Sequence, residues 1–320
     1  MSILVFLEHH DGELQKGALG VLAKAAQLGD DDVAGVVVGS DVRALAEQAG
    51  KFGAARVFVA DDAALDAPLP QPRVDVLASV VREHGFDTVL FAASVLAADV
   101  AAGLAARLDA GLNWDLVDLD RREGQLVAKR PALGDSVFVD VGWTSEPRLA
   151  MFRSGTFDPA AVGGTAEVLD VPVQLEEHSR AATMVEQAHA ASEGPNLEEA
   201  DVIVAGGRGL GGPENFTLVE ELAKALGGAV GATRAVVDAG WYPYSTQIGQ
   251  TGKSVSPKLY VACGISGAIQ HKVGMQSSGT IVAINKDPNA PIFEFCDLGV
   301  VGDVHQVVPK LTELVRQRRG

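Results

Sequence analysis

Residues 263–275, CGISGAIQHKVGM, place His271 behind a short apolar run and among small residues. A core strand would not need Gly264 and Gly267, and a surface loop would not need the interspersed apolar side chains. Glycine lets backbone N–H groups approach a bound group closely, and an imidazole can supply a hydrogen bond. The stretch therefore suggests backbone held against a flat, partly polar ligand. The alternative is that Ser266 caps a helix and His271 is structural.

A second glycine-rich stretch, VAGGRGLGGPENF, follows a predicted strand and opens a predicted helix. Its Gly207-x-Gly209-x-x-Gly212 spacing satisfies the dinucleotide fingerprint, in which glycines bring a pyrophosphate to a helix N-terminus. That fingerprint also needs an acidic ribose ligand after the second strand, where this chain has Thr233-Arg234. Two interpretations of the glycines stay open, a dinucleotide site and a tight turn without a ligand.

Further polar residues stand where predicted strands end. Arg208 and Arg234 each follow a strand, and the carboxyl ends of parallel strands share the edge at which ligands bind. The polar loop around 248–251 could offer hydrogen bonds to a heterocycle, and Asn285 and Asp303 could meet an adenine or a ribose. Solvated arginines, a plain surface loop and turn chemistry are the alternatives.

Composition and missing motifs narrow the function further. The 320 residues carry 26 basic and 42 acidic side chains, a formal net charge of -16, which argues against a nucleic-acid partner. No residues have the pattern of a hydrolytic triad, an acid pair or a metal cluster, so neither catalytic residues nor a metal is predicted. The start, MSILVFLEHHDGE, lacks the features of a signal sequence, and no stretch approaches the length of a membrane span. We therefore expect a cytoplasmic protein that does not insert into a membrane.

Strand-like and helix-like segments alternate in the first half of the chain. Runs such as ILVFLEH, VAGVVVGS and ARVFVAD alternate with Ala- and Leu-rich helical segments, a pattern typical of a parallel sheet buried on both faces. The runs DLVDLD, QLVAKRPAL, SVFVDVGW and RLAMFR have no helix between them and predict an antiparallel extension of that sheet.

A polar, acidic segment containing Gly194-Pro195 separates this half from a second α/β unit. Within the second unit, residues 213–228 are predicted to be a helix with Pro213 in its first turn and Gly227 at its end. The predicted fold is α/β, with two three-layer α/β domains and mostly parallel sheets, the first with an antiparallel extension. The predicted domains are residues 1–190, which resemble nucleotide-binding folds in general, and residues 191–320.

Four stretches together resemble one family: GGRGLGGPENF, GATRAVVDAGW, QIGQTGKSVSPKLYVACGISGAIQHKVGM and AINKDPNAPIFEFCDLGVVGD. In this order they are similar to the carboxyl-terminal half of the electron transfer flavoprotein alpha subunit. The resemblance implies a heterodimer with a beta subunit, one FAD per heterodimer held mostly by residues 191–320, and AMP in the beta subunit. The first domain would pack on that beta subunit.

The resemblance also implies an electron carrier rather than an enzyme. Electrons would arrive from flavin-dependent, acyl-CoA-type dehydrogenases, as in fatty acid β-oxidation, and leave to a membrane quinone oxidoreductase. An anionic semiquinone stabilised by Arg234 and by a donating His271 is the hypothesis for its mechanism. Two rival functions are an NAD-dependent oxidoreductase that uses Gly207–Gly212 and a nonredox nucleotide-binding module.

Matching motifs carry the family's cofactor contacts onto particular residues of this chain. Arg208 would lie by the FAD phosphate or adenine portion, with Asn285 and Asp303 at the adenosine end. Thr233 and Arg234 would line the flavin side. The flavin ring would be wrapped by Ile248, Gly249, Gln250 and Thr251, with Thr251 near N5. The remaining contacts run along the cofactor to His271, near the flavin O2, and comprise Ser266, Gly267, Ala268, Ile269, Gln270 and His271.

Overall fold

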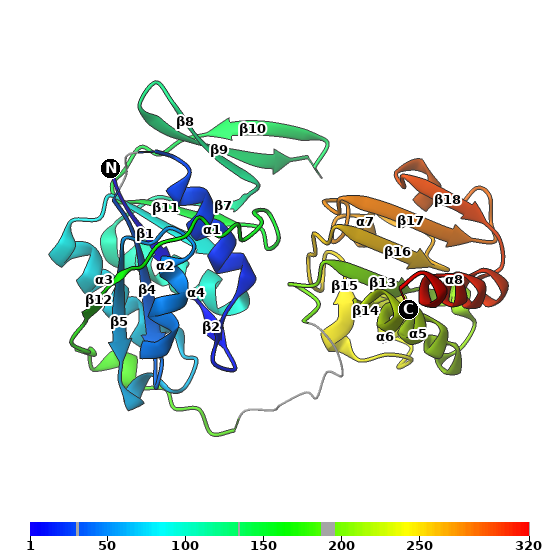
Figure 1. Cartoon of the computed structure of the whole chain (residues 1–320), viewed down its shortest axis with the longest axis horizontal. Coiled ribbons are helices and arrows are strands. Elements are labelled where there is room, and N and C mark those ends of the chain that lie inside the picture. The colour runs from blue at the N-terminus through cyan, green and yellow to red at the C-terminus, as the bar shows by residue number, and fades with distance from the viewer. Residues whose placement is uncertain (30–31, 134, 187–195, 320) are drawn as a thin grey trace. The chain divides into compact units, whose positions relative to one another are not determined.

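The chain folds into two compact units, Met1–His189 and Ala190–Gly320, in this computed structural model. The structure describes residues 1–29, 32–133, 135–186 and 196–319, and Figure 1 shows the elements of each unit. The boundary predicted between residues 190 and 191, like the Gly194-Pro195 pair, lies in 187–195, outside the described residues.

Seven parallel strands form the main sheet of the first unit, in the order β12-β5-β4-β1-β6-β11-β7. They are β1 (Ser2–Phe6), β4 (Asp32–Gly39), β5 (Arg56–Asp61), β6 (Thr88–Ala92), β7 (Leu112–Leu116), β11 (Arg148–Phe152) and β12 (Glu167–Asp170). A two-stranded hairpin, β2 (His9–His10) with β3 (Glu13–Leu14), follows β1. After a polar first residue, each of the central strands β4, β1, β6 and β11 is apolar, because helices cover both faces of this sheet.

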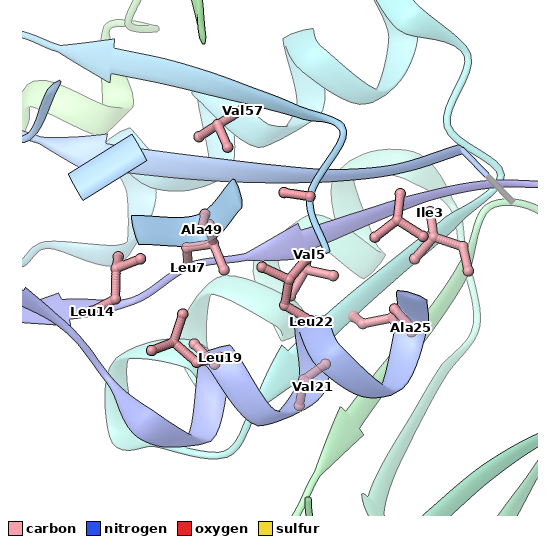
Figure 2. Packing of buried hydrophobic residues seen from close by; sticks show 14 of the residues in the cluster. Ile3, Val5, Leu7, Leu14, Leu19, Val21, Leu22, Ala25, Ala49 and Val57 are labelled. Carbon is pink, nitrogen blue, oxygen red and sulfur yellow. The ribbon is translucent and has the colours of Figure 1, made fainter. Parts of the chain in front are cut away.

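Two pairs of helices make the outer layers of the first unit. The first pair, α1 (Lys16–Ala26) and α2 (Ala46–Gly50), packs on one face, and Figure 2 shows Leu22 of α1 beside the strand residue Val5. The second pair, α3 (Pro70–His84) and α4 (Val95–Leu108), packs on the other face. Small residues let these helices pack closely: Gly17 of α1 lies against Ala92 of β6, and Gly103 of α4 lies against Val74 of α3.

Three antiparallel strands of the first unit form a separate sheet in the order β10-β9-β8. They are β8 (Asp118–Arg122), β9 (Gln125–Ala132) and β10 (Val137–Val141). The run RLAMFR was expected among the antiparallel strands, and that expectation is wrong, because β11 pairs in parallel with β6 and β7. All but the first residue of β11 are buried, as in an interior parallel strand, and the antiparallel strands supply the long crossover that a parallel partner needs.

Six parallel strands form the sheet of the second unit, in the order β15-β14-β13-β16-β17-β18. They are β13 (Val202–Gly206), β14 (Ala229–Thr233), β15 (Gln247–Ile248), β16 (Leu259–Cys263), β17 (Thr280–Asn285) and β18 (Leu298–Val301). The chain enters at β13, adds β14 and β15 on one side, and then continues with β16 on the other side. The strand order therefore reverses between β13 and β16, and the predicted α/β fold with mostly parallel sheets is confirmed.

The two faces of the second sheet are covered differently. Helices α5 (Phe216–Leu226), α6 (Arg234–Val237) and α8 (Val304–Arg319) pack on one face. The other face is covered by the short α7 (Ile269–Lys272) and by loop residues, among them Val255, Met275 and Ile292. No helix among the described residues is both long enough and apolar enough to cross a membrane.

The start and end of α5 follow the predicted signals. Pro213 begins a 3₁₀ turn, Pro213–Asn215, that leads into the helix, and its fixed φ suits that first turn. Gly227 caps the helix end with a left-handed φ of 65°, which glycine adopts without a Cβ clash. Both predictions for this helix are confirmed.

Candidate functional site

A pocket of about 580 Å³ opens at the carboxyl ends of the strands of the second unit. It lies where the strand order reverses between β13 and β16, which is the place where open parallel sheets bind ligands. Ligand pockets commonly have volumes of roughly 300–1,000 Å³. The pocket brings together most of the predicted site residues: Arg208, Thr233, Arg234, Ile248, Gly249, Gln250, Thr251, Ser266, Ala268, Gln270, His271 and Asn285.

The glycine-rich loops that follow β13 and β16 are hydrogen-bonded to each other at the point where the strand order reverses. The Gly207 N–H donates to the Cys263 carbonyl at 3.0 Å, and the Gly209 N–H donates to the Gly264 carbonyl at 2.9 Å. A Cβ on Gly207 would lie 2.4 Å from the Gly264 oxygen, so a side chain would force the loops apart. The glycines are thus explained by backbone packing. They do not lead straight into a helix N-terminus, because 3₁₀ turns precede α5.

The loop after β15 is closed by hydrogen bonds between its two ends. The Lys253 N–H donates to the Gln247 carbonyl at 2.8 Å, and the Gly249 N–H donates back to the Lys253 carbonyl at 3.1 Å. The Gln250 N–H donates to the Gln270 carbonyl at 2.7 Å, which ties this loop to α7. The side chains of Gln250 and Thr251 are therefore presented to the pocket by a loop of fixed shape.

His271 is buried at the pocket wall, and both of its ring nitrogens have partners inside the protein. Nδ1 lies 3.0 Å from the Ile248 carbonyl oxygen, which can only accept, so Nδ1 carries the proton. Nε2 lies 2.9 Å from the Tyr260 hydroxyl, which therefore donates to it. Burial lowers the pKa of His271 to about 4, so the ring is neutral at neutral pH. The expectation that His271 donates to a ligand is not met in this arrangement, because its only N–H is already used.

A run of backbone donors lies between β16 and α7. Within the described chain, the N–H groups of residues 266–270 make no hydrogen bond, and Ser266 does not cap α7, whose N-cap is Ala268. The Arg208 side chain likewise has no hydrogen-bond or ion-pair partner among the described residues, and it lines the same pocket. Unpaired N–H groups and a free guanidinium together form a donor set suited to a phosphate or another anion.

Arg234 stands at the pocket rim as the first residue of α6, but it is already paired. Its Nε lies 3.1 Å from the Asp238 carboxylate, and both side chains are more than 60% exposed. An exposed pair one helical turn apart is worth little, so a ligand can compete for the guanidinium. Thr233, which ends β14, is nearly buried beside it and also lines the pocket.

Three predicted site residues do not line the pocket. Asp303 instead lies directly before α8, where its carboxylate accepts the His305 N–H at 2.9 Å. Gly267 packs against the backbone of Ile292, and the Ile269 side chain is exposed. Asn285 does line the pocket, and its side-chain amide donates to the Ile265 carbonyl at 2.8 Å.

Sequence reasoning missed residues that shape the site from behind. Gln247 and Tyr260 are buried and bond to Thr251 and His271 respectively, while Asp238 and Asp287 line the pocket. The sequence carries no signal for these bonds, because Gln247 lies in a stretch rich in hydroxyls and amides and Tyr260 lies in an apolar strand. The acidic residues looked like ordinary turn and helix residues. No cluster of three potential metal ligands occurs among the described residues.

Comparison with known proteins gives matches along both units. Residues 3–176 match the family described as electron transfer flavoprotein domain, and residues 196–276 match the electron transfer flavoprotein FAD-binding domain. The chain is 40% identical to electron transfer flavoprotein subunit alpha of Thermoanaerobacterium thermosaccharolyticum, over 99% of this chain and 98% of that protein. Proteins of the same name from Mycobacterium leprae and Bacillus subtilis are 42% and 38% identical, each over 99% of this chain, covering 99% and 98% of those proteins.

Proposed function

Because the chain belongs to the family of electron transfer flavoprotein alpha subunits, we propose that it holds one FAD in the pocket of its second unit and serves as an electron carrier. It would do so in a heterodimer with a beta subunit, which would carry AMP and pack on the first unit. The carrier turns over no substrate of its own.

The observation that carries the proposal is the donor set at the reversal point of the second sheet. Among the described residues, the N–H groups of 266–270 and the Arg208 guanidinium have no hydrogen-bond partner, and Arg208, Ser266, Ala268 and Gln270 line one pocket. A dinucleotide cofactor brings a pyrophosphate that needs such donors, together with ring systems that fit between apolar and hydroxyl-bearing walls. The residues present therefore fit FAD.

A bound flavin supplies the redox chemistry, and the residues of the chain bind it and set its electrostatic surroundings. Arg234 would place a positive charge near the ring and so favour an anionic, singly reduced flavin. Asp238 opposes this effect, because it shares the guanidinium. The neutral, internally bonded His271 would contribute shape and rigidity rather than an N–H.

Electron donors and acceptors follow from the family rather than from any contact in this chain. We propose flavin-dependent dehydrogenases of the acyl-CoA type as donors, which would place the carrier in fatty acid β-oxidation, and a membrane quinone oxidoreductase as acceptor.

The test is co-expression with a candidate beta subunit, followed by an absorbance spectrum during stepwise addition of dithionite. A flavin spectrum with accumulation of the singly reduced form is expected. Arg234→Ala should lower that accumulation, whereas Arg316→Ala, which removes an exposed arginine from α8, should not. A colourless heterodimer that binds only NADH or AMP would contradict the proposal.

A further inference from the structure

We propose that Gln247 is a positioning residue that orients the Thr251 hydroxyl so that its proton points into the pocket. Gln247 as a residue is 2% exposed, and its Nε2 lies 3.0 Å from the Thr251 carbonyl oxygen and 3.1 Å from Thr251 Oγ1. Thr251 is therefore held by two hydrogen bonds to the same buried side-chain amide, that of Gln247.

The orientation of the Gln247 amide is fixed by the backbone. The Thr251 carbonyl oxygen can only accept a hydrogen bond, so the group facing it is the NH₂ of Gln247 and not its Oε1. The same nitrogen then faces Thr251 Oγ1. Because an amide nitrogen does not accept hydrogen bonds, Oγ1 is the acceptor in that contact.

As a consequence, the Thr251 hydroxyl accepts a hydrogen bond from Gln247 and keeps its own proton available for the pocket. A threonine hydroxyl has one proton, and this proton is not used toward Gln247. Within the described chain the Thr251 hydroxyl donates to no group, and Thr251 is exposed and lines the pocket. Thr251 therefore offers the pocket a donor and would be matched by a ring nitrogen or a carbonyl oxygen of a heterocycle.

The surrounding loop keeps this geometry rigid. The Tyr244 hydroxyl donates to the same Thr251 carbonyl at 3.1 Å, and the backbone of Gln247 accepts the Lys253 N–H. Loss of the Gln247 amide would leave the loop closed by these other bonds, but the Thr251 hydroxyl would be free to rotate. Gln247 thus determines which way the proton points more than it determines whether the loop forms.

The first test is a double-mutant cycle that measures FAD affinity in the heterodimer. This measurement rests on the proposed FAD site. Thr251→Val removes the hydroxyl and should weaken FAD binding about 5-fold, the effect of one hydrogen bond. Gln247→Leu should weaken it by a similar factor, and the double variant by about 5-fold rather than about 25-fold. Thr251→Ser should restore wild-type affinity. Gln306→Leu, at an exposed glutamine of α8 outside the pocket, should change nothing.

Additive losses in the double variant would overturn the proposal, because Gln247 would then act independently of the hydroxyl. The absorption maximum of the bound flavin gives a second readout, and Gln247→Leu should shift it in the same direction as Thr251→Val. A loss of structure alone would not reproduce that shift.

A measurement without flavin separates this inference from the proposed function. In the flavin-free heterodimer, the side-chain NH₂ signal of Gln247 in a ¹⁵N–¹H NMR spectrum should move in Thr251→Val and stay in place in Thr251→Ser. If it moves but FAD does not bind, the proposed function fails while the geometry stands. If it does not move, the hydrogen bond is absent and the inference fails, whatever the flavin does.

Discussion

Tyr260 is a fully buried phenol whose hydroxyl has one hydrogen-bond partner in the described part of the chain, the imidazole of His271. Since Nδ1 of that ring donates to the Ile248 carbonyl, Nε2 is a buried acceptor that depends on the Tyr260 hydroxyl. A buried polar group without its partner costs more than the bond itself contributes, because its desolvation is no longer compensated. This pair therefore links the middle of the second sheet to the pocket wall.

Tyr260→Phe should lower the free energy of unfolding by about 1–3 kcal/mol, the cost of leaving Nε2 unpaired. Tyr242→Phe is the matched control, because its hydroxyl bonds to the exposed Glu220 and its ring stays stacked on Phe216. That control should cost less than about 1 kcal/mol. Urea unfolding followed by circular dichroism measures the free energy of unfolding of both variants. Equal decreases would show that the buried hydrogen bond stabilises the protein no more than the exposed one.

His271 should make the protein less stable as the pH falls. Its pKa is about 4 when folded and 6.5 when unfolded, so below pH 6.5 the unfolded chain takes up a proton that the folded chain refuses. The loss is about 1.4 kcal/mol per pH unit at most, and it ends near pH 4 because the folded ring is then protonated too.

Unfolding free energies at pH 6.5 and pH 5 test this prediction. The wild type should lose about 2 kcal/mol more than His271→Asn between these values. His9, whose pKa burial also lowers, contributes equally to both proteins and cancels from the comparison. The exposed His305 provides the control, and His305→Asn should keep the wild-type pH dependence.

The sequence predicted the site residues that stand at the ends of strands. It did not predict the buried residues that hydrogen-bond to site residues from inside the protein. Arg208, Arg234 and Asn285 were predicted because the carboxyl edge of a parallel sheet is a known place for ligands, whereas Thr233 was predicted from the family resemblance. Gln247 and Tyr260 were not found, because their partners come from loops folded over the sheet. No periodicity in a sequence encodes such a bond.

At the scale of elements, the loop between β16 and α7 contains two glycines in a left-handed conformation, Gly264 and Gly267. Gly267 has φ +85°, and a Cβ there would lie 2.3 Å from the backbone nitrogen of Ile292. The Ile292 N–H also donates to the Ser266 carbonyl at 3.0 Å, so this loop and the turn after β17 hold each other in place. That contact fixes the backbone of the segment whose N–H groups, those of 266–270, have no partner among the described residues.

Gly267→Ala should therefore both destabilise the second unit and lower its flavin content. The left-handed conformation alone costs about 1–2 kcal/mol for a residue with a Cβ, and the clash with backbone adds to it. Gly240→Ala isolates the first cost, because Gly240 has φ +71° and nothing within 4 Å of a Cβ. Urea midpoints and the ratio of flavin to protein absorbance are the measurements. Full flavin content in Gly267→Ala would contradict the role given to this loop.

Strand direction shows why part of the fold escaped prediction. Alternation of apolar runs and helices identified the parallel strands of both units, and Pro213 and Gly227 marked the ends of a helical segment correctly. The sequence of the run 148–153 does not indicate whether the strand pairs in parallel or antiparallel, because a short apolar strand has the same pattern in both kinds of sheet. Its parallel pairing depends on the whole length of chain that precedes it.

For the whole molecule, the pocket belongs to one unit. Its lining residues all lie between Gly207 and Pro291, and the second sheet has an apolar cluster on each face. The first described residues after 187–195 already belong to this unit, because Leu197 and Ala200 are buried in one cluster and Glu198 pairs with Lys253. A unit with its own core and its own pocket is expected to fold alone.

A fragment of residues 196–320 should consequently unfold in one cooperative transition. Tyr260→Phe should lower the stability of the fragment by the same amount as in the full chain, since the bond that it removes lies wholly inside the fragment. Urea unfolding of the fragment and of the full chain, each with and without the substitution, supplies the comparison. A fragment without a transition would show that residues 1–195 are needed to hold the second unit together. Unequal losses would show that the first unit alters the packing around Tyr260.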